Sequence, residues 1–286
     1  MKRNTFFGFV TPSLIVMVGL MVLPLLASLV LGLHRITIRN LRAPAWIGLQ
    51  NYEDVLSDPR FWDSLEFTLI FIAVTVPIRM LLGLAFALLL DQIVKWRGFF
   101  IAGSLMPFVL TPVVGTLIFR DLFDIGGPLS YVLNELFNFR MIWNTVNVRV
   151  LIIIHSLWVS TPFAMIVFFA GLQTLPKERL EAARVDGASW LKQLRHIAIP
   201  HLYSLFVFVA LISTMDSYRV LDSVLVLTRQ NPQIDARTVM YYSFLTAVEF
   251  RRWGKANAMS IITVVGIFIV LIPFLIMTYR DQLQED

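Results

Sequence analysis

The chain contains no cysteine. It can therefore form no disulfide, hold no Cys-ligated metal and use no thiolate nucleophile. It also lacks the GxxxxGK[ST] pattern of a phosphate-binding loop, so it cannot supply such an ATP site itself. The patterns HExxH and GxSxG, which mark many metalloproteases and serine hydrolases, are absent as well. These absences argue against an enzyme built on a common catalytic motif.

Charged residues are scarce. Only 15% of the 286 residues are charged, whereas 57% are hydrophobic. A soluble domain has about 45–50% apolar residues, so the excess indicates membrane spans. The net charge of +5 could suggest a nucleic-acid partner. However, the basic residues are spread over short loops between apolar runs, so we expect membrane lipid around the chain and no nucleic acid.

Six apolar stretches are long enough to cross a membrane, which takes about 20 residues of helix. They comprise residues 7–33, 67–90, 99–120, 150–172, 202–227 and 256–279. Each should be a helix, because a helix satisfies its own backbone hydrogen bonds in lipid. The first run is too long for the apolar core of a signal peptide, so it is predicted to be an uncleaved span. With no internal repeat or linker, residues 1–286 are predicted to form a single all-α domain.

A charged segment separates the fourth and fifth apolar stretches. Pro176 suits a helix start, and good helix formers follow it as far as Asp186. Gly187 then interrupts the helix, and Ser189 can cap a second one. The pattern predicts a helix, a tight glycine turn and a helix lying across the membrane face. An amphipathic helix that simply rests among the lipid headgroups is the alternative.

This segment resembles the EAA loop of permease subunits of binding-protein-dependent ABC importers. The residues that carry the resemblance are Glu181, Ala182, Ala183, Gly187 and the ending 197–200, Ile-Ala-Ile-Pro. The likeness extends over nearly the whole chain, including residues 46–52, 58–62 and 161–163. It is strongest to the first permease of maltose-type and glycerol-phosphate-type systems. One departure is residues 228–232, where the family usually has a Gly-rich turn after the threonine.

The resemblance implies six transmembrane helices with a cytoplasmic coupling loop between helices four and five. It places the chain in the bacterial inner membrane with both termini in the cytoplasm, an orientation that the Lys and Arg counts of the loops leave open. The implied partners are a second permease subunit, two copies of a cytoplasmic ABC ATPase, an external periplasmic binding protein and a sugar-type small molecule. No cofactor is expected in this chain, since ATP and Mg²⁺ would bind to the ATPase. The implied coupling residues are Glu181, Ala182, Ala183, Asp186 and Gly187, with the two alanines leaving a slim side for close approach.

Charged residues inside spans are expensive and are candidate functional residues. Arg79 lies near the middle of the second apolar stretch, about 18 Å from either end, and Asp216, Tyr218 and Arg219 form a polar cluster in the fifth. They are candidates for the translocation path of a sugar, polyol or glycoside. Arg79 also makes an anionic sugar derivative a candidate, because a guanidinium binds anionic groups well. The alternative is structural pairing of Asp216 with Arg79 or with Arg219.

Two other classes of function, a secondary transporter and an intramembrane enzyme, are alternatives to an importer. A secondary transporter usually needs ionisable relays within its spans and two matching halves, but Asp216 is the one acid in the middle of a span and no repeat is evident. An intramembrane enzyme could combine Ser104 or Ser160 with His155, although no motif supports that arrangement. We therefore expect a transport subunit with no catalytic residues and no metal site.

Overall fold

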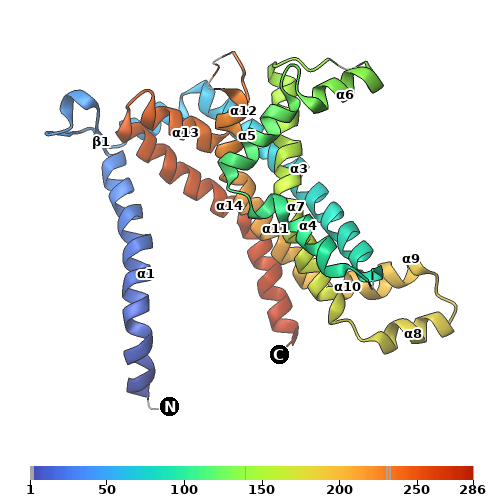
Figure 1. Ribbon diagram of the computed structural model, residues 1–286. Helices are drawn as coiled ribbons and strands as arrows, with labels where there is room; N and C mark the ends of the chain where they lie inside the picture. Colours follow the sequence, from blue (N-terminus) through green and yellow to red (C-terminus); the bar gives the residue numbers. More distant parts are fainter. Residues whose placement is uncertain (1–2, 94, 139, 230, 232, 286) are drawn as a thin grey trace. The chain divides into compact units, whose positions relative to one another are not determined.

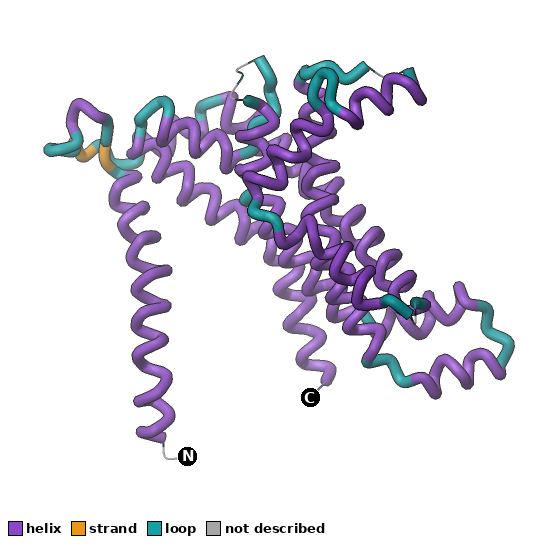
Figure 2. Tube along the Cα trace, viewed as in Figure 1, coloured by secondary structure: helices purple, strands orange, loops and turns teal. Residues whose placement is uncertain are grey.

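The protein is described here by a computed structural model that covers residues 3–93, 95–138, 140–229, 231 and 233–285. Helices dominate these residues, and loops join them (Figures 1 and 2). In chain order the elements are α1 (Arg3–Gly32), β1 (His34–Arg35), η1 (Ile38–Asn40), β2 (Ala45–Trp46), α2 (Gln50–Leu56), α3 (Pro59–Gln92), α4 (Arg97–Val109), α5 (Pro112–Phe123), α6 (Pro128–Phe137), α7 (Thr145–Gln173), α8 (Lys177–Val185), α9 (Trp190–Gln193), η2 (Leu194–Ala198), α10 (Ile199–His201), α11 (Tyr203–Tyr218), α12 (Asp222–Thr228), α13 (Val239–Val248) and α14 (Trp253–Glu285).

The chain divides into two compact units. The first comprises residues up to Ser64 together with Val239–Ile269, and the second comprises Leu65–Thr238 with Val270–Asp286. No comparison tests the expectation of a single domain, which stays a prediction. Each unit is described separately below.

The first unit joins α1 to α2, α13 and the beginning of α14. After α1, β1 and β2 form a short antiparallel pair in which His34 lies opposite Trp46. The buried amide of Asn51 donates to the carbonyls of Gly32 and His34, at 2.7 and 2.9 Å. The backbone N–H of Trp253 donates to Ile36 O at 3.1 Å. The Asn51 bonds attach the end of α1 and β1 to α2, and the Trp253 bond attaches the residue that follows β1 to the first turn of α14.

The second unit has a core made by α3, α7 and α11. Its buried cluster consists of Leu84, Ala87, Ala164, Phe168, Leu202 and Val209. Gly83 brings α3 and α7 together, since a Cβ at this position would lie 2.6 Å from the Cβ of Ala164. A glycine at the crossing allows the close helix approach that is common in membrane bundles.

Among the residues that the structure describes, four helical stretches are long and apolar enough to span a membrane without a break, and they are Val10–Gly32, Pro59–Gln92, Thr145–Gln173 and Trp253–Ile276. They overlap the predicted stretches 7–33, 67–90, 150–172 and 256–279. Two bent helix pairs raise the number to six if each pair is counted as one span. The six-span arrangement is thus compatible with the structure, but its exact spans stay a prediction.

The prediction of one continuous helix over residues 99–120 is wrong. α4 ends at Val109 and α5 begins at Pro112, with a bend of 97° between the two sides of the break. Leu110 and Thr111 have extended backbones, with ψ of 143° and 139°. The cause is Pro112, because a proline disfavours the helical conformation of the residue before it and suits the first turn of a new helix.

The continuous helix predicted over residues 202–227 is also interrupted. α11 ends at Tyr218, and α12 begins at Asp222. Neither glycine nor proline marks this break in the sequence. The Thr238 hydroxyl donates to the carbonyl of Val220 at 2.9 Å, and Asp222 places a negative charge in the first turn of α12. A hydrogen bond from a residue distant in sequence and a favourable start to α12 thus stabilise the non-helical segment between α11 and α12, which the local sequence does not predict.

Candidate functional site

The charged segment after α7 forms a two-armed loop (Figure 2). α8 is the first arm, while α9, η2 and α10 make the second. α8 ends in a Schellman motif, in which Ala188 N donates to Ala183 O at 2.8 Å and Gly187 N donates to Arg184 O at 3.0 Å. Gly187 has a φ of +75°, the left-handed conformation that glycine adopts without strain. The turn is therefore short and well hydrogen-bonded.

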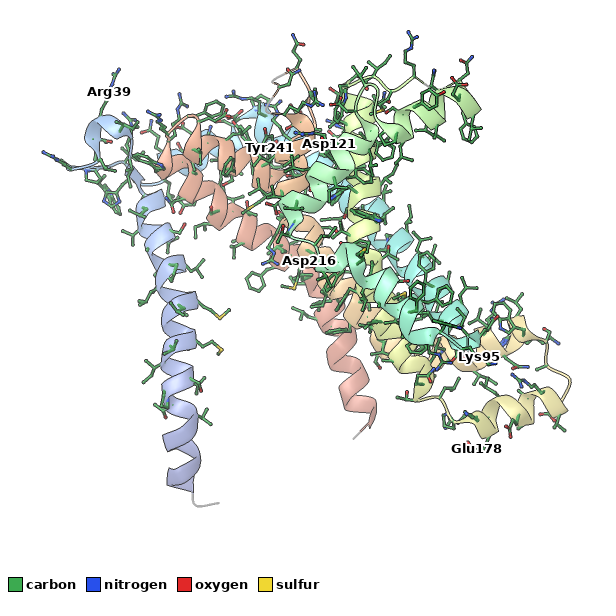
Figure 3. The ribbon with its side chains drawn as sticks, viewed as in Figure 1. Arg39, Lys95, Asp121, Glu178, Asp216 and Tyr241 are labelled. Atoms are coloured by element: carbon green, nitrogen blue, oxygen red, sulfur yellow. The ribbon has the colours of Figure 1, made fainter. Side chains whose placement is uncertain are left out.

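The charged side chains of α8 are exposed and unpaired. From Lys177 to Asp186, within the part of the chain that the structure describes, none of them forms a hydrogen bond or an ion pair with its side chain. Figure 3 shows Glu178 on the side of α8 turned away from α9. Val185 is 88% exposed at the tip of the loop, and the nearby Trp190 and Leu191 are exposed as well. Such a surface can bind a partner through both charge and apolar contact.

The two arms enclose a cavity of about 620 Å³. α8 contributes Arg179, Ala182, Ala183 and Asp186 to its lining, and the second arm contributes His196, Ile197, Pro200 and His201. The face of α8 that carries the small side chains of the two alanines thus lies along this cavity. Glu181 is exposed and does not line the cavity. Because the cavity separates the two arms, their relative position depends on the contacts that each arm makes at its end next to the helix bundle.

The bases of both arms are tied to the helix bundle. Gln173, at the end of α7, donates to Asp91 in α3 at 2.7 Å. The Thr174 hydroxyl lies 2.9 Å from Nε2 of His201, which joins the first arm to the end of the second. Ser189 occupies the predicted capping position of α9, but its hydroxyl makes no capping hydrogen bond. The fixed points of the loop are therefore its bases and its glycine turn.

Arg79 lies inside the second unit and is 2% exposed. Its Nη2 lies 3.2 Å from the Ser156 hydroxyl and 3.5 Å from the Ser217 hydroxyl, and its Nε has no hydrogen-bond partner in the described structure. Arg79 forms no salt bridge among the described residues. The guanidinium is thus surrounded by neutral hydroxyls from α7 and α11 and is incompletely satisfied.

The other three candidates for the translocation path differ in exposure. Asp216 and Arg219 form an ion pair at 3.3 Å with side chains that are 53% and 65% exposed, and Figure 3 labels Asp216 on α11. Tyr218 is 2% exposed. Of the two structural pairings considered from the sequence, the contact between Asp216 and Arg219 is present and a salt bridge to Arg79 is not. In this conformation a ligand could reach only the exposed pair.

Two further polar contacts involve residues noted in the sequence. His155 in α7 lies 3.2 Å from the Thr116 hydroxyl of α5, so this histidine forms a hydrogen bond between helices. Arg229 has a φ of 53° where the family usually has glycine. Its guanidinium lies 2.7 Å from Asp124 and 4.5 Å from the ring centroid of Trp143. Of the departing segment 228–232, residues 230 and 232 lie outside the described residues.

One buried charge cluster in the first unit was not predicted from the sequence. Asp58 Oδ2 accepts from Lys255 at 2.8 Å and from the Tyr242 hydroxyl at 2.5 Å, and Oδ1 accepts from the partly exposed Arg60 at 3.2 Å. Burial by itself raises the pKa of Asp58, but the hydrogen bonds from Lys255, Tyr242 and Arg60 outweigh it, and the pKa lies well below its usual range. No local pattern links residues that are 197 positions apart.

Comparison with known proteins adds independent information. Over residues 45–284 the chain matches the family described as binding-protein-dependent transport system inner membrane component. It is 30% identical to a probable ABC transporter permease protein of Sinorhizobium fredii, over 98% of this chain and 91% of that one. It is 29% identical to the trehalose/maltose transport system permease protein MalF of Thermococcus litoralis, over 93% and 90%.

The fold is similar to that of a solved transporter. A crystal structure of a bacterial ABC transporter involved in the import of the acidic polysaccharide alginate contains a chain that aligns with a TM-score of 0.84 at 16% identity. The alignment covers 98% of this chain and 96% of the other. At that identity the likeness concerns the fold alone, whereas the family match covers most of the sequence. The chain therefore belongs to the binding-protein-dependent transport system inner membrane components, as a carbohydrate-type ABC permease.

Proposed function

We propose that this chain is the transmembrane subunit of an ATP-driven importer and forms one half of the path for a sugar, polyol or glycoside. A second permease would form the other half, and an external binding protein would deliver the cargo. Two copies of a cytoplasmic ATPase would bind ATP and Mg²⁺. The loop from α8 to α10 would be the element on which that ATPase acts, with Glu181, Ala182, Ala183, Asp186 and Gly187 as its coupling residues.

The main support is the unpaired charge of α8. Charged side chains that form no hydrogen bond or ion pair among the described residues are available to pair with those of a partner. Val185 and Trp190 add exposed apolar surface next to them, which is the composition of a binding patch rather than of a merely solvated loop. The family membership and the absence of a phosphate-binding loop both favour an ATPase on a separate chain.

The contacts where the loop joins the helix bundle suggest how a displacement of α8 would be transmitted to the membrane spans. Gln173 connects the end of α7 to Asp91 of α3, and Thr174 connects it to His201. Displacement of α8 would therefore move the ends of three helices together rather than bend a single linker. The hydrogen bonds of the Schellman turn at Gly187 stabilise the C-terminal end of α8 against unfolding when the partner displaces it.

Substitution of Gly187 tests this proposal. No atom lies within 4 Å of where its Cβ would be, so a side chain there meets no obstacle and only the backbone is strained. Gly187→Val should uncouple ATP hydrolysis from uptake, because a β-branched residue resists the left-handed conformation at a cost above about 1–2 kcal/mol. Gly187→Asn should retain most of the coupling, since asparagine tolerates that conformation. The measurement is uptake per ATP hydrolysed in proteoliposomes.

Gly126 provides the matched control. It also has a positive φ, of +83°, and open space around its Cβ position, but it lies in the turn between α5 and α6. Gly126→Val should leave the ratio of uptake to hydrolysis unchanged. Normal coupling in Gly187→Val, with normal membrane insertion, would contradict the coupling role of the loop.

The cargo proposal concerns Arg79 and the pair of Asp216 and Arg219. The exposed pair on α11 would contact cargo directly, and Tyr218 would support it from the buried side. Arg79 would reach cargo only if α3, α7 and α11 separate during transport. Its incompletely bonded guanidinium favours an anionic sugar derivative, because a carboxylate or phosphate would satisfy it better than hydroxyls do.

Arg79→Gln separates the two cargo classes. If the cargo is anionic, this variant should lower the uptake rate about 10-fold or more, given that a hydrogen bond to a charged group contributes about 1.5–3 kcal/mol. Neutral sugars should be transported at nearly the rate of the unmodified protein. The assay compares uptake of matched neutral and acidic sugars by the assembled transporter. Equal rates for the acidic cargo in both proteins would exclude the role of Arg79.

A further inference from the structure

A second cavity lies in the first unit, at the end of α1 that precedes β1. Its volume is about 280 Å³, and its polar lining comes from Arg35, Thr37, Asn51, Asp54, Arg252 and Lys255. Figure 1 shows the segments that carry these residues, β1 and the beginning of α14, on the same side of this unit as the end of α1. The coupling role of α8 does not involve this cavity.

Lys255 is the buried basic residue of the cavity lining, and it forms an ion pair with Asp58. Its residue is 9% exposed, and its Nζ donates to Asp58 at 2.8 Å. An ammonium has three donors, and no second partner occurs among the described residues, so two of them are available to a ligand. Lys255 also lies in the first turn of α14, where the helix dipole favours an anion. The remaining N–H groups of Lys255 can therefore donate to oxygen atoms of a ligand, while the uncompensated positive charge of the lining comes from two arginines.

Two arginines complete the basic side of the cavity. Arg252 precedes α14, and Arg35 lies on β1, where it donates to Gln50 at 3.1 Å. Both are exposed, so their guanidinium groups can turn toward a bound anion and donate in pairs to its oxygens. Asp54 supplies one carboxylate, which together with Thr37 would accept hydrogen bonds from hydroxyl groups. The lining thus fits a ligand that carries both an anionic group and hydroxyls.

Two apolar helices meet the cavity at their ends. The apolar helix α1 ends at Gly32, and the apolar helix α14 begins at Trp253, directly beside the lining residues. Trp46, opposite His34 on the β-strand pair, is 65% exposed, and Leu49 is 63% exposed. An exposed tryptophan at the end of a span is typical of the lipid interface. A basic cavity beside such residues matches the headgroup level of a bilayer.

We propose that this cavity binds the headgroup of an anionic, hydroxyl-bearing phospholipid of the phosphatidylglycerol type. The phosphate would lie between Lys255, Arg35 and Arg252, and the glycerol hydroxyls would face Asp54 and Thr37. The acyl chains would lie along the exposed surface of α1, none of whose spanning window is buried. The lipid would thereby hold the end of α1 to the beginning of α14.

Lipid binding by the full-length permease, purified in detergent and delipidated, tests the proposal. Phosphatidylglycerol and phosphatidylcholine are titrated, and retained lipid is counted by native mass spectrometry. The unmodified protein should retain phosphatidylglycerol in preference to phosphatidylcholine. The double variant Arg35→Ala/Arg252→Ala should bind it at least ~10-fold more weakly, given about a factor of ten for each lost charge-assisted hydrogen bond. Lys255 is left intact because it pairs with Asp58.

Arg39→Ala/Arg42→Ala is the matched control. It removes the same number of charges, both from the segment that follows β1, but neither residue lines the cavity. Figure 3 labels Arg39, which belongs to η1 in that segment. This control should retain the lipid as the unmodified protein does, and Arg35→Lys/Arg252→Lys should retain most of it. If both alanine variants lose the same amount of phosphatidylglycerol, the lipid is attracted by the overall positive charge of this region and not by the cavity, and the proposal is wrong.

Two further outcomes would also overturn it. If inorganic phosphate stabilises the protein as strongly as phosphatidylglycerol does, the site is one for a free anion. If Arg35→Ala/Arg252→Ala keeps its lipid but no longer binds the external binding protein, the cavity is a docking site for an acidic side chain. Retention of phosphatidylglycerol that depends on the two arginines, with no competition from phosphate, supports the lipid site.

Discussion

The buried charged residues Arg79 and Lys255 are stabilised in different ways. Lys255 has a full carboxylate partner in Asp58, which also accepts from the Tyr242 hydroxyl. Arg79 has hydroxyl oxygens as its hydrogen-bond partners and forms no salt bridge among the described residues, and its Nε is unpaired there. Burying a charge is tolerable when it is paired and hydrogen-bonded, and otherwise it is costly. The Asp58 cluster is therefore well paired, whereas the incomplete bonding of Arg79 is consistent with its proposed role in the cargo path.

Asp58→Asn should strongly destabilise the protein, because it leaves Lys255 buried without a countercharge. Breaking a buried pair in this way costs about 3–5 kcal/mol. Arg60→Ala removes the partner that is 52% exposed and should cost at most about 1 kcal/mol. Thermal unfolding of the purified permease at neutral pH measures both. Similar unfolding temperatures for the two variants would contradict a structural role for the buried pair.

The same pair predicts how stability changes with pH. Because the pKa of Asp58 is lowered in the folded protein, the stability it contributes is present above the ordinary carboxylate pKa of about 3.9 and is lost as the pH falls below that value. The difference in unfolding temperature between the unmodified protein and Asp58→Asn should therefore shrink on acidification below about pH 4.

At the scale of the elements, glycine determines how closely α3 and α7 approach. A Cβ on Gly83 would lie 2.6 Å from the Cβ of Ala164 and about as close to the α7 backbone, at 3.0 and 3.1 Å. Backbone atoms cannot rotate away as a flexible side chain does. The helices would have to separate, and the core cluster around Phe168 would lose contact.

Gly83→Ala should therefore lower the stability of the permease by about 1–3 kcal/mol, the usual cost of overpacking. Gly103→Ala is the matched control, since Gly103 lies within α4 with nothing near its Cβ position. It should be neutral or stabilising by up to about 1 kcal/mol. Unfolding temperatures of the two variants check the prediction, which fails if Gly83→Ala is as stable as Gly103→Ala.

The breaks between elements show where prediction from the sequence fails and where it succeeds. Pro112 is a residue that favours the start of a helix, and α5 begins there. The long apolar run around it nevertheless led to the prediction of a continuous helix and gave no indication of the 97° bend. The gap between Tyr218 and Asp222 has no such marker, since it depends on the Thr238 hydroxyl bonding to Val220. By contrast, the turn after α8 was predictable at Gly187, because both of its bonds lie within six residues.

For the whole molecule, family membership identifies a transport component of the inner membrane rather than an enzyme. The secondary-transporter and intramembrane-enzyme alternatives are therefore set aside. The orientation of the chain is still a proposal, and it requires the tip of the α8 loop to lie in the cytoplasm. The absence of cysteine makes this orientation directly testable.

Single cysteines at Val185 and Ile125 should label from opposite sides of the membrane. Val185 is 88% exposed at the end of α8, and Ile125 is 79% exposed in the turn between α5 and α6. In intact cells a membrane-impermeant maleimide should react with Ile125→Cys and not with Val185→Cys, and it should react with both after permeabilisation. The reverse pattern in intact cells would place the α8 loop outside and refute the proposed orientation.

The sequence by itself determined the apolar stretches, the helix–glycine turn–helix loop and the family, because each depends on residues that are close together in the chain. Only the tertiary structure decided which charges are buried and with what partners. Asp58 meets Lys255 across 197 residues, and Arg79 meets Ser217 across 138. Hydropathy and helix propensity act over a turn or two of chain, whereas a buried polar contact depends on how distant helices pack.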